Sequence, residues 1–149
     1  RVEKLAKPTH RLMLMLSTFD VIGTAAVAMA TWPYPRGDIY GSMGNMNTCK
    51  AQYFFATLGL AVPMFNASLC LLYLLTIKHR MNLAQFATKI EPFLHAVSVL
   101  IPLTLASVPV ATNQVRYSLL TPMCCVTIDS TVGWPIVCVP LLSFLICLY

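Results

Sequence analysis

The chain has 149 residues, of which 58 % are hydrophobic and 10 % are charged, and its mean hydropathy is +0.73. A water-soluble domain carries about a quarter charged residues, so this composition excludes an ordinary soluble domain and predicts a membrane protein. The net charge of +5 does not indicate a nucleic-acid partner, because the sequence holds no RNA- or DNA-reading motif and anionic headgroups explain its basic residues.

Four apolar stretches follow one another along the chain, at residues 12–32, 51–77, 92–112 and 132–149. Each is close to the ~20 residues that a helix needs to cross a hydrocarbon core. None alternates polar and apolar residues with period two, which disfavours the strands of a membrane barrel. We therefore predict an all-α, polytopic transmembrane helix bundle that forms a single transmembrane domain over residues 1–149.

Basic residues are concentrated in alternate gaps between these stretches. The segment before the first stretch and the gap after the second hold seven of them, and the other two gaps hold three. Because cytosolic segments carry the excess of Lys and Arg, we expect residues 1–11 and 78–91 to be cytosolic in a multi-pass protein of the plasma membrane. The seven are Arg1, Lys4, Lys7, Arg11, Lys78, Arg80 and Lys89, and the three are Arg36, Lys50 and Arg116.

The first stretch contains an acidic residue, Asp20, about 12 Å along a helix from Leu12 and so near the membrane midplane. A carboxylate there costs a few kcal/mol and normally has a partner or an ion. One interpretation is an ion, proton or coupling site, which we favour. The other is a packing hydrogen bond. Gly23, one turn further, offers a small residue for close contact between helices.

The second stretch contains Asn66, in Asn66-Ala67-Ser68, which matches a glycosylation motif. Its position within a membrane span forbids glycosylation, so a hydrogen bond across helices, with Asp20 as a candidate partner, is the better interpretation. Lys78, His79 and Arg80 follow this stretch. These cations suit a helix C-terminus and anionic headgroups, and a docking surface for a cytosolic partner is the alternative.

Three cysteines lie on the predicted non-cytosolic side, where disulfides persist. Cys49 precedes the second stretch, and Cys124 and Cys125 lie between the third and fourth. We expect Cys49 to bond one of the pair, with Cys125 preferred and Cys124 as the alternative. At the start of the third stretch, Glu91 and His95 are four residues apart and are expected to form a local pair.

Enzyme signatures are absent from the sequence. Its three histidines have no metal-ligand spacing, and there is no phosphate-binding glycine loop, His-Glu-x-x-His motif or nucleophile elbow. We therefore expect no catalytic activity, no metal and no cofactor.

Three features together resemble helices two to five of a seven-helix G-protein-coupled receptor. They are an acidic residue midway along the second helix (Asp20), a cysteine at the outer end of the third (Cys49) with a cysteine in the next outer loop, and a basic cluster at the cytosolic end of the third (residues 78–80). The acidic-Arg-aromatic triplet of rhodopsin-like receptors is missing. Residues 65–78 and 89–95 are more similar to an atypical receptor-like group of diatoms and related algae, distantly similar to cyclic-AMP and secretin-type receptors.

This resemblance implies a signalling receptor that changes its helix arrangement when an extracellular ligand binds and exposes a cytosolic surface to a heterotrimeric G protein. It implies that Asp20 and Asn66 belong to an interior polar network, that Cys49 and Cys125 form the outer disulfide, and that residues 78–80 lie at the partner surface. It further implies a fragment, with one helix before Arg1 and two after Tyr149.

Two other functional classes remain open. A secondary transporter or channel subunit would use Asp20 as a proton or cation site, although the sequence shows no internal repeat. A four-helix scaffold of the tetraspan type would need a larger outer loop than the gaps here provide. Membrane lipid is the one partner that all three classes share.

Overall fold

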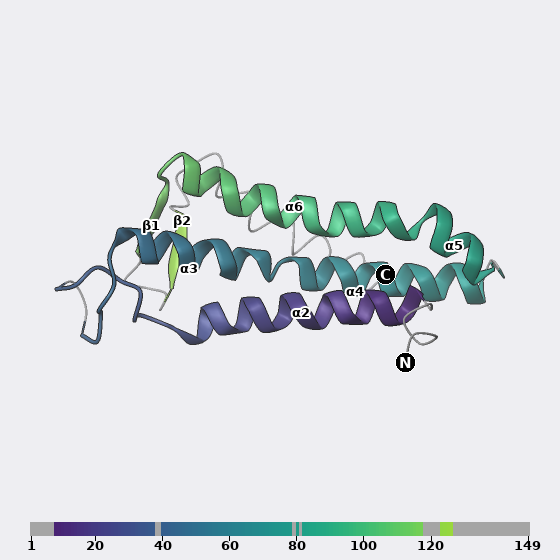
Figure 1. Cartoon of the computed structure of the whole chain (residues 1–149), viewed down its shortest axis with the longest axis horizontal. Helices are drawn as coiled ribbons and strands as arrows, with labels where there is room; N and C mark the ends of the chain where they lie inside the picture. Colours follow the sequence, from purple (N-terminus) through teal and green to yellow (C-terminus); the bar gives the residue numbers. More distant parts are fainter. Residues whose placement is uncertain (1–7, 38–39, 79, 81, 118–122, 127–149) are drawn as a thin grey trace.

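The computed structural model describes residues 8–37, 40–78, 80, 82–117 and 123–126. Long helices lie side by side along one axis, and a pair of short strands covers one end (Figure 1). Two helices in line, α3 and α4, lie between α2 and α6 and contact both of them. In chain order the elements are α2 (Pro8–Ala28), α3 (Met46–Leu58), α4 (Ala61–Ile77), α5 (Leu83–Lys89), α6 (Glu91–Ala111), β1 (Val115–Tyr117) and β2 (Cys124–Val126).

Three helical segments are long and apolar enough to cross a membrane: Pro8–Ala28, Met46–Ile77 and Glu91–Ala111. They correspond to the first three predicted stretches. The fourth, residues 132–149, lies outside the described residues. The first helix starts and ends four residues earlier than predicted. Pro8 is the first residue that the structure describes, and Ala30, with φ 46°, stops the helix beyond Ala28.

The second span is divided into α3 and α4, where the sequence predicted one continuous helix. Pro63 has no N–H to donate to the carbonyl of Gly59, and the chain satisfies that carbonyl with a tighter bond from the Val62 N–H at 3.0 Å. Gly59 and Leu60 likewise bond three residues back, to Ala56 and Thr57. Both segments keep nearly one direction (Figure 1), so the interruption loosens the span without ending it.

The strands add a small sheet to a chain that we predicted to be all helical. β1 and β2 pair antiparallel, with Arg116 opposite Cys125 and Tyr117 opposite Cys124. Beneath them lies one of two buried apolar clusters, and the second lies toward the opposite end, around α4 and α5. The first cluster contains Tyr34, Cys49, Tyr53, Val115, Cys124 and Val126, and the second contains Leu12, Ala61, Phe65, Leu72 and Phe86.

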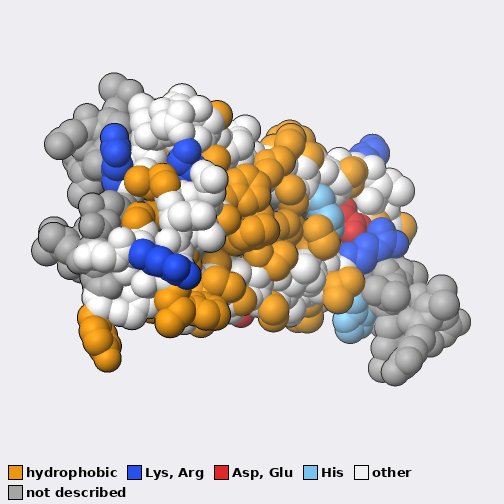
Figure 2. Space-filling model, turned by 60° about the vertical axis from the view of Figure 1, so that its left-hand side comes forward, with side chains coloured by type: hydrophobic (Ala, Val, Ile, Leu, Met, Phe, Trp, Pro, Cys, Tyr) orange, Lys and Arg blue, Asp and Glu red, His pale blue; other side chains and the backbone are white. Residues whose placement is uncertain are grey.

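Basic residues lie near both ends of the rod, and hydrophobic side chains cover the middle of the face shown in Figure 2. This follows from the chain path, because α2 and α6 run in one direction and α3 and α4 run in the other. Although both ends carry basic residues, we call the end without the disulfide the basic end and the other the disulfide end. The basic end carries Arg11, Lys78, Arg80 and Lys89, and the disulfide end carries Cys49, Cys124, Arg36, Lys50 and Arg116.

Candidate functional site

A disulfide joins Cys49 of α3 to Cys124 of β2, with their Cα atoms 5.6 Å apart. The preference for Cys125 was therefore wrong, and the alternative Cys124 is the partner. Side chains alternate between the two faces of a strand, so only one of two adjacent cysteines can point at α3. Cys124 is 2 % exposed in the core, whereas Cys125 is partly exposed. The bond ties the start of the second span to the chain that follows the third.

Gln52, one turn after Cys49, connects three elements at the disulfide end. Its Nε2 donates to the carbonyls of Ala26 (3.2 Å) and Ala30 (2.7 Å), and its Oε1 accepts the N–H of Cys124 (3.2 Å). The carbonyls at the end of α2 need such partners because no further helical turn supplies donors. We did not single out Gln52 from the sequence, although an amide three residues after a cysteine in an apolar stretch was a usable signal.

Two spans approach each other closely at Gly23 of α2 and Gly59, at the interruption between α3 and α4. A Cβ atom added at Gly23 would lie 2.8 Å from the Cα of Gly59. A larger residue at Gly23 would force the two backbones apart, so the contact requires a small residue. The sequence analysis named Gly23 as a small residue for such a contact between helices.

Asp20 lies one turn before Gly23 and lines a hollow of 540 Å³ between α2 and the interrupted span. Its side chain is exposed within the described part of the protein. The hydroxyl of Thr24, which also lines the hollow, donates to the backbone carbonyl of Asp20 at 2.6 Å. Gly59 and Pro63 line the same hollow, so Asp20 lies beside the helix interruption.

Asn66 is also exposed, on α4, and no hydrogen bond joins it to Asp20 among the described residues. It follows Gly59 by two helical turns and so lies on roughly the same side of the span. The predicted network of these two residues thus remains a prediction, and their direct contact is not present. The described residues also contain no group of three or more His, Cys, Asp or Glu side chains that could hold a metal ion.

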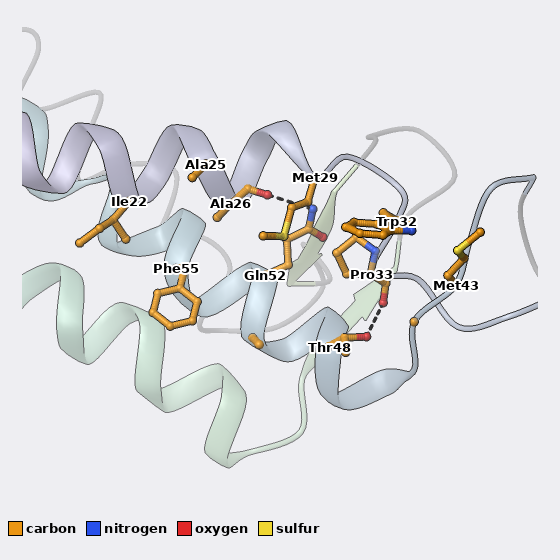
Figure 3. Close-up of a pocket in the computed structure, with 12 residues that line it drawn as sticks. Ile22, Ala25, Ala26, Met29, Trp32, Pro33, Met43, Thr48, Gln52 and Phe55 are labelled. Carbon is orange, nitrogen blue, oxygen red and sulfur yellow. Dashed lines mark hydrogen bonds between the residues drawn. The ribbon is translucent and has the colours of Figure 1, made fainter.

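An apolar groove of 590 Å³ lies between α2 and α3 toward the disulfide end (Figure 3). Ile22 and Ala25 of α2, with Met29 just after its end, form one wall, and Phe55 of α3 is on the other. Trp32 lies at the end of the groove nearest the disulfide end. The sequence analysis did not anticipate this groove, because it depends on how two helices are spaced.

At the basic end, Lys78 caps α4 and is exposed, as is Arg80. His79, the third residue of the predicted partner surface, lies outside the described residues. The exposure of Lys78 and Arg80 is compatible with a partner or with lipid headgroups, so their predicted role stays a prediction.

The expected pair of Glu91 and His95 does not form. Glu91, only 4 % exposed, instead has its Oε1 3.5 Å from Nη1 of Arg11 on α2. The His95 ring packs edge-on against Phe65, with centroids 5.5 Å apart. A full positive charge from a neighbouring helix is the stronger partner for a carboxylate, and the histidine turns toward α4.

Comparisons with protein-family models, with curated proteins and with solved structures found no match. The described residues form a mostly helical protein with three segments long and apolar enough to cross a membrane, a disulfide at one end, and the acidic residue Asp20 beside an interrupted helix.

Proposed function

We propose that this chain is the membrane-embedded part of a seven-transmembrane, receptor-like signalling protein. It would sense a ligand outside the cell and pass the signal to a cytosolic partner such as a heterotrimeric G protein. The observation that carries the proposal is the bond between Cys49 at the start of α3 and Cys124 in the chain after α6. A cysteine pair in these two places is one of the three features that make the sequence similar to G-protein-coupled receptors.

The surroundings of Asp20 support a role in switching. A carboxylate within a membrane span is costly and is therefore usually kept for function. Asp20 lies beside the tight contact of Gly23 with Gly59. Gly59 is also where the described part of the second span is interrupted. A movement of α2 against α3 and α4 would change the environment of Asp20, and this couples the charge to the helix arrangement.

The basic end supports the proposed cytosolic side. Lys78 and Arg80 are exposed there, on the side where Lys89 and Arg11 also lie. In the sequence, residues 1–11 and 78–91 hold seven of the ten Lys and Arg residues, and this excess supports a cytosolic location by the positive-inside rule. An acidic surface on a signalling partner would be attracted to the same charges.

The test uses the complete protein that contains this chain, expressed in cells with a G-protein activation reporter, and measures the basal signal per molecule at the surface. We expect Asp20→Asn to change that signal by about fivefold or more, a usual size for coupling between sites. Surface expression should stay close to that of the unsubstituted protein. Asp38→Asn, the same exchange in the sequence between α2 and α3, is the matched control. A collapse of expression with an unchanged signal per molecule would make Asp20 structural and contradict the proposal.

A second candidate, a transporter or channel subunit, is favoured by the same hollow. Interrupted helices place backbone groups beside ions in transporters, and Asp20 lines one hollow with Gly59, where the second span is interrupted. Proteoliposomes with an imposed pH gradient distinguish this candidate from the receptor. Proton or cation flux that Asp20→Asn abolishes would support transport, whereas the receptor proposal expects no flux.

A further inference from the structure

We propose that the apolar groove between α2 and α3 binds one phospholipid. An acyl chain would lie between the two helices and the phosphate would lie on Arg36. This inference depends on the membrane location of the chain and not on the receptor proposal, so either can fail without the other.

The groove is on the side of the bundle that suits lipid. At about 100° per residue, Ile22 and Ala25 lie on the side of α2 opposite Asp20 and Thr24. The hollow at Asp20 and the groove therefore open on opposite sides of the contact between α2 and the second span. A charged side has to face protein or water, whereas the described residues that line the groove include no charged residue and can face hydrocarbon.

The polar groups in the groove wall are already bonded within the protein. Thr48 donates its hydroxyl to the carbonyl of Pro33 at 2.8 Å, and the amide of Gln52 bonds α2 and Cys124. Figure 3 shows the bonds of Gln52 to Ala26 and of Thr48 to Pro33, and both end on backbone carbonyls. A polar ligand would lose its water contacts here without gaining new ones, whereas an acyl chain loses nothing. The wall chemistry thus selects a hydrocarbon.

The mouth of the groove supplies the charge for a headgroup. Met43 lines the groove, and its carbonyl accepts a hydrogen bond from Nε of Arg36 at 3.2 Å, which holds the exposed guanidinium beside the opening. Trp32, 59 % exposed, lies at the same end, and tryptophan is typical of the headgroup level of a membrane. A guanidinium there can bind a phosphate through two parallel hydrogen bonds. Apolar walls below a cation fit a phospholipid better than a sterol, which has no phosphate.

The test labels the full chain in phosphatidylcholine nanodiscs that contain a phosphatidylcholine with a photoreactive acyl chain, and maps the labelled peptides by mass spectrometry. We expect the label to concentrate on the groove walls around Ile22 and Phe55 rather than on Phe93 and Leu100, which are exposed on α6. Ala51→Trp fills the groove and should lower the groove label by about fivefold. Ala96→Trp, the same exchange at an exposed site on α6, should not.

A second arm tests the headgroup. Arg36→Gln should lower the groove label from the phospholipid by about threefold and leave that from a matching photoreactive diacylglycerol unchanged. An unbroken Cys49–Cys124 crosslink in each variant shows that the fold is retained, and Ile22→Trp replaces Ala51→Trp if the latter does not fold. Equal labelling of all apolar faces, or no effect of Arg36→Gln, would overturn the proposal. Displacement of the phospholipid label by a sterol would also overturn it, in favour of a sterol site.

Discussion

Gly23 and Gly59 meet backbone to backbone, so closely that a Cβ on Gly23 would lie 2.8 Å from the Cα of Gly59. This contact lies between two mostly apolar hollows, of which one is lined by the acidic residue Asp20 and the other by no charged residue. The one beside Asp20 is on one side of α2, and the apolar groove is on the other. A shift of α2 against α3 and α4 would alter both hollows at once, so the glycine contact mechanically links the hollow at Asp20 to the apolar groove.

We expect Gly23→Ala to destabilise the protein. Alanine favours a helix over glycine by about 1 kcal/mol, but overpacking against a backbone costs about 1–3 kcal/mol, so the steric term should win. The measurement is the thermal midpoint in detergent. Ser17→Thr, which adds one carbon at an exposed site on α2, is the control and should change the midpoint little. A midpoint raised by Gly23→Ala would mean that the two helices separate at no cost.

Replacing the two neighbouring cysteines should have different effects. Cys124→Ser removes a crosslink that spans 75 residues and should cost about 2–5 kcal/mol of stability. Cys125→Ser leaves that bond intact and should have a much smaller effect. Proteolysis without reductant, followed by mass spectrometry, should yield a peptide in which Cys49 is bonded to Cys124. Loss of the Cys49 crosslink on Cys125→Ser alone would contradict the pairing described here.

Gln52→Leu should weaken the disulfide end. The variant keeps an apolar volume but leaves the N–H of Cys124 and the carbonyls at the end of α2 without their partner. Unsatisfied buried groups cost about 1–3 kcal/mol each, so we expect a lower thermal midpoint and slower formation of the crosslink. Gln85→Leu, the same exchange at an exposed site on α5, is the control. Equal midpoints for the two variants would show that these hydrogen bonds contribute nothing.

A double-mutant cycle measures the ion pair of Arg11 with Glu91. Because the arginine side chain is 47 % exposed, we expect Arg11→Gln and Glu91→Gln to show a coupling free energy of only about 1 kcal/mol. Lys89→Gln, which removes an exposed charge nearby in the sequence, should show no coupling to Glu91. Chemical denaturation of the four proteins gives the value, and additive effects of the two substitutions would exclude a working pair.

Much of the fold follows from local sequence. Hydropathy is summed over neighbouring residues, so the first three spans could be placed within a few residues of their observed ends. Pro63 signals a disturbed helix in the second span. The placement of cysteines in the gaps between the apolar stretches leaves Cys124 and Cys125 as the two possible disulfide partners of Cys49. The small strands escaped prediction because β1 and β2 have three residues each and are stabilised by packing against α3.

Tertiary structure decided which side chains meet. The choice of Cys124 over Cys125 depends on the register and facing of β2, and a change of one residue would reverse it. Glu91 pairs with Arg11 rather than His95 because α2 and α6 bring their ends together across 80 residues of chain. Asp20 and Asn66 share a predicted role but not a contact. The sequence thus determined the apolar composition and the segments able to span a membrane, because both depend on neighbouring residues alone. The tertiary structure decided which side chains meet, because that depends on how each packed helix or strand is rotated.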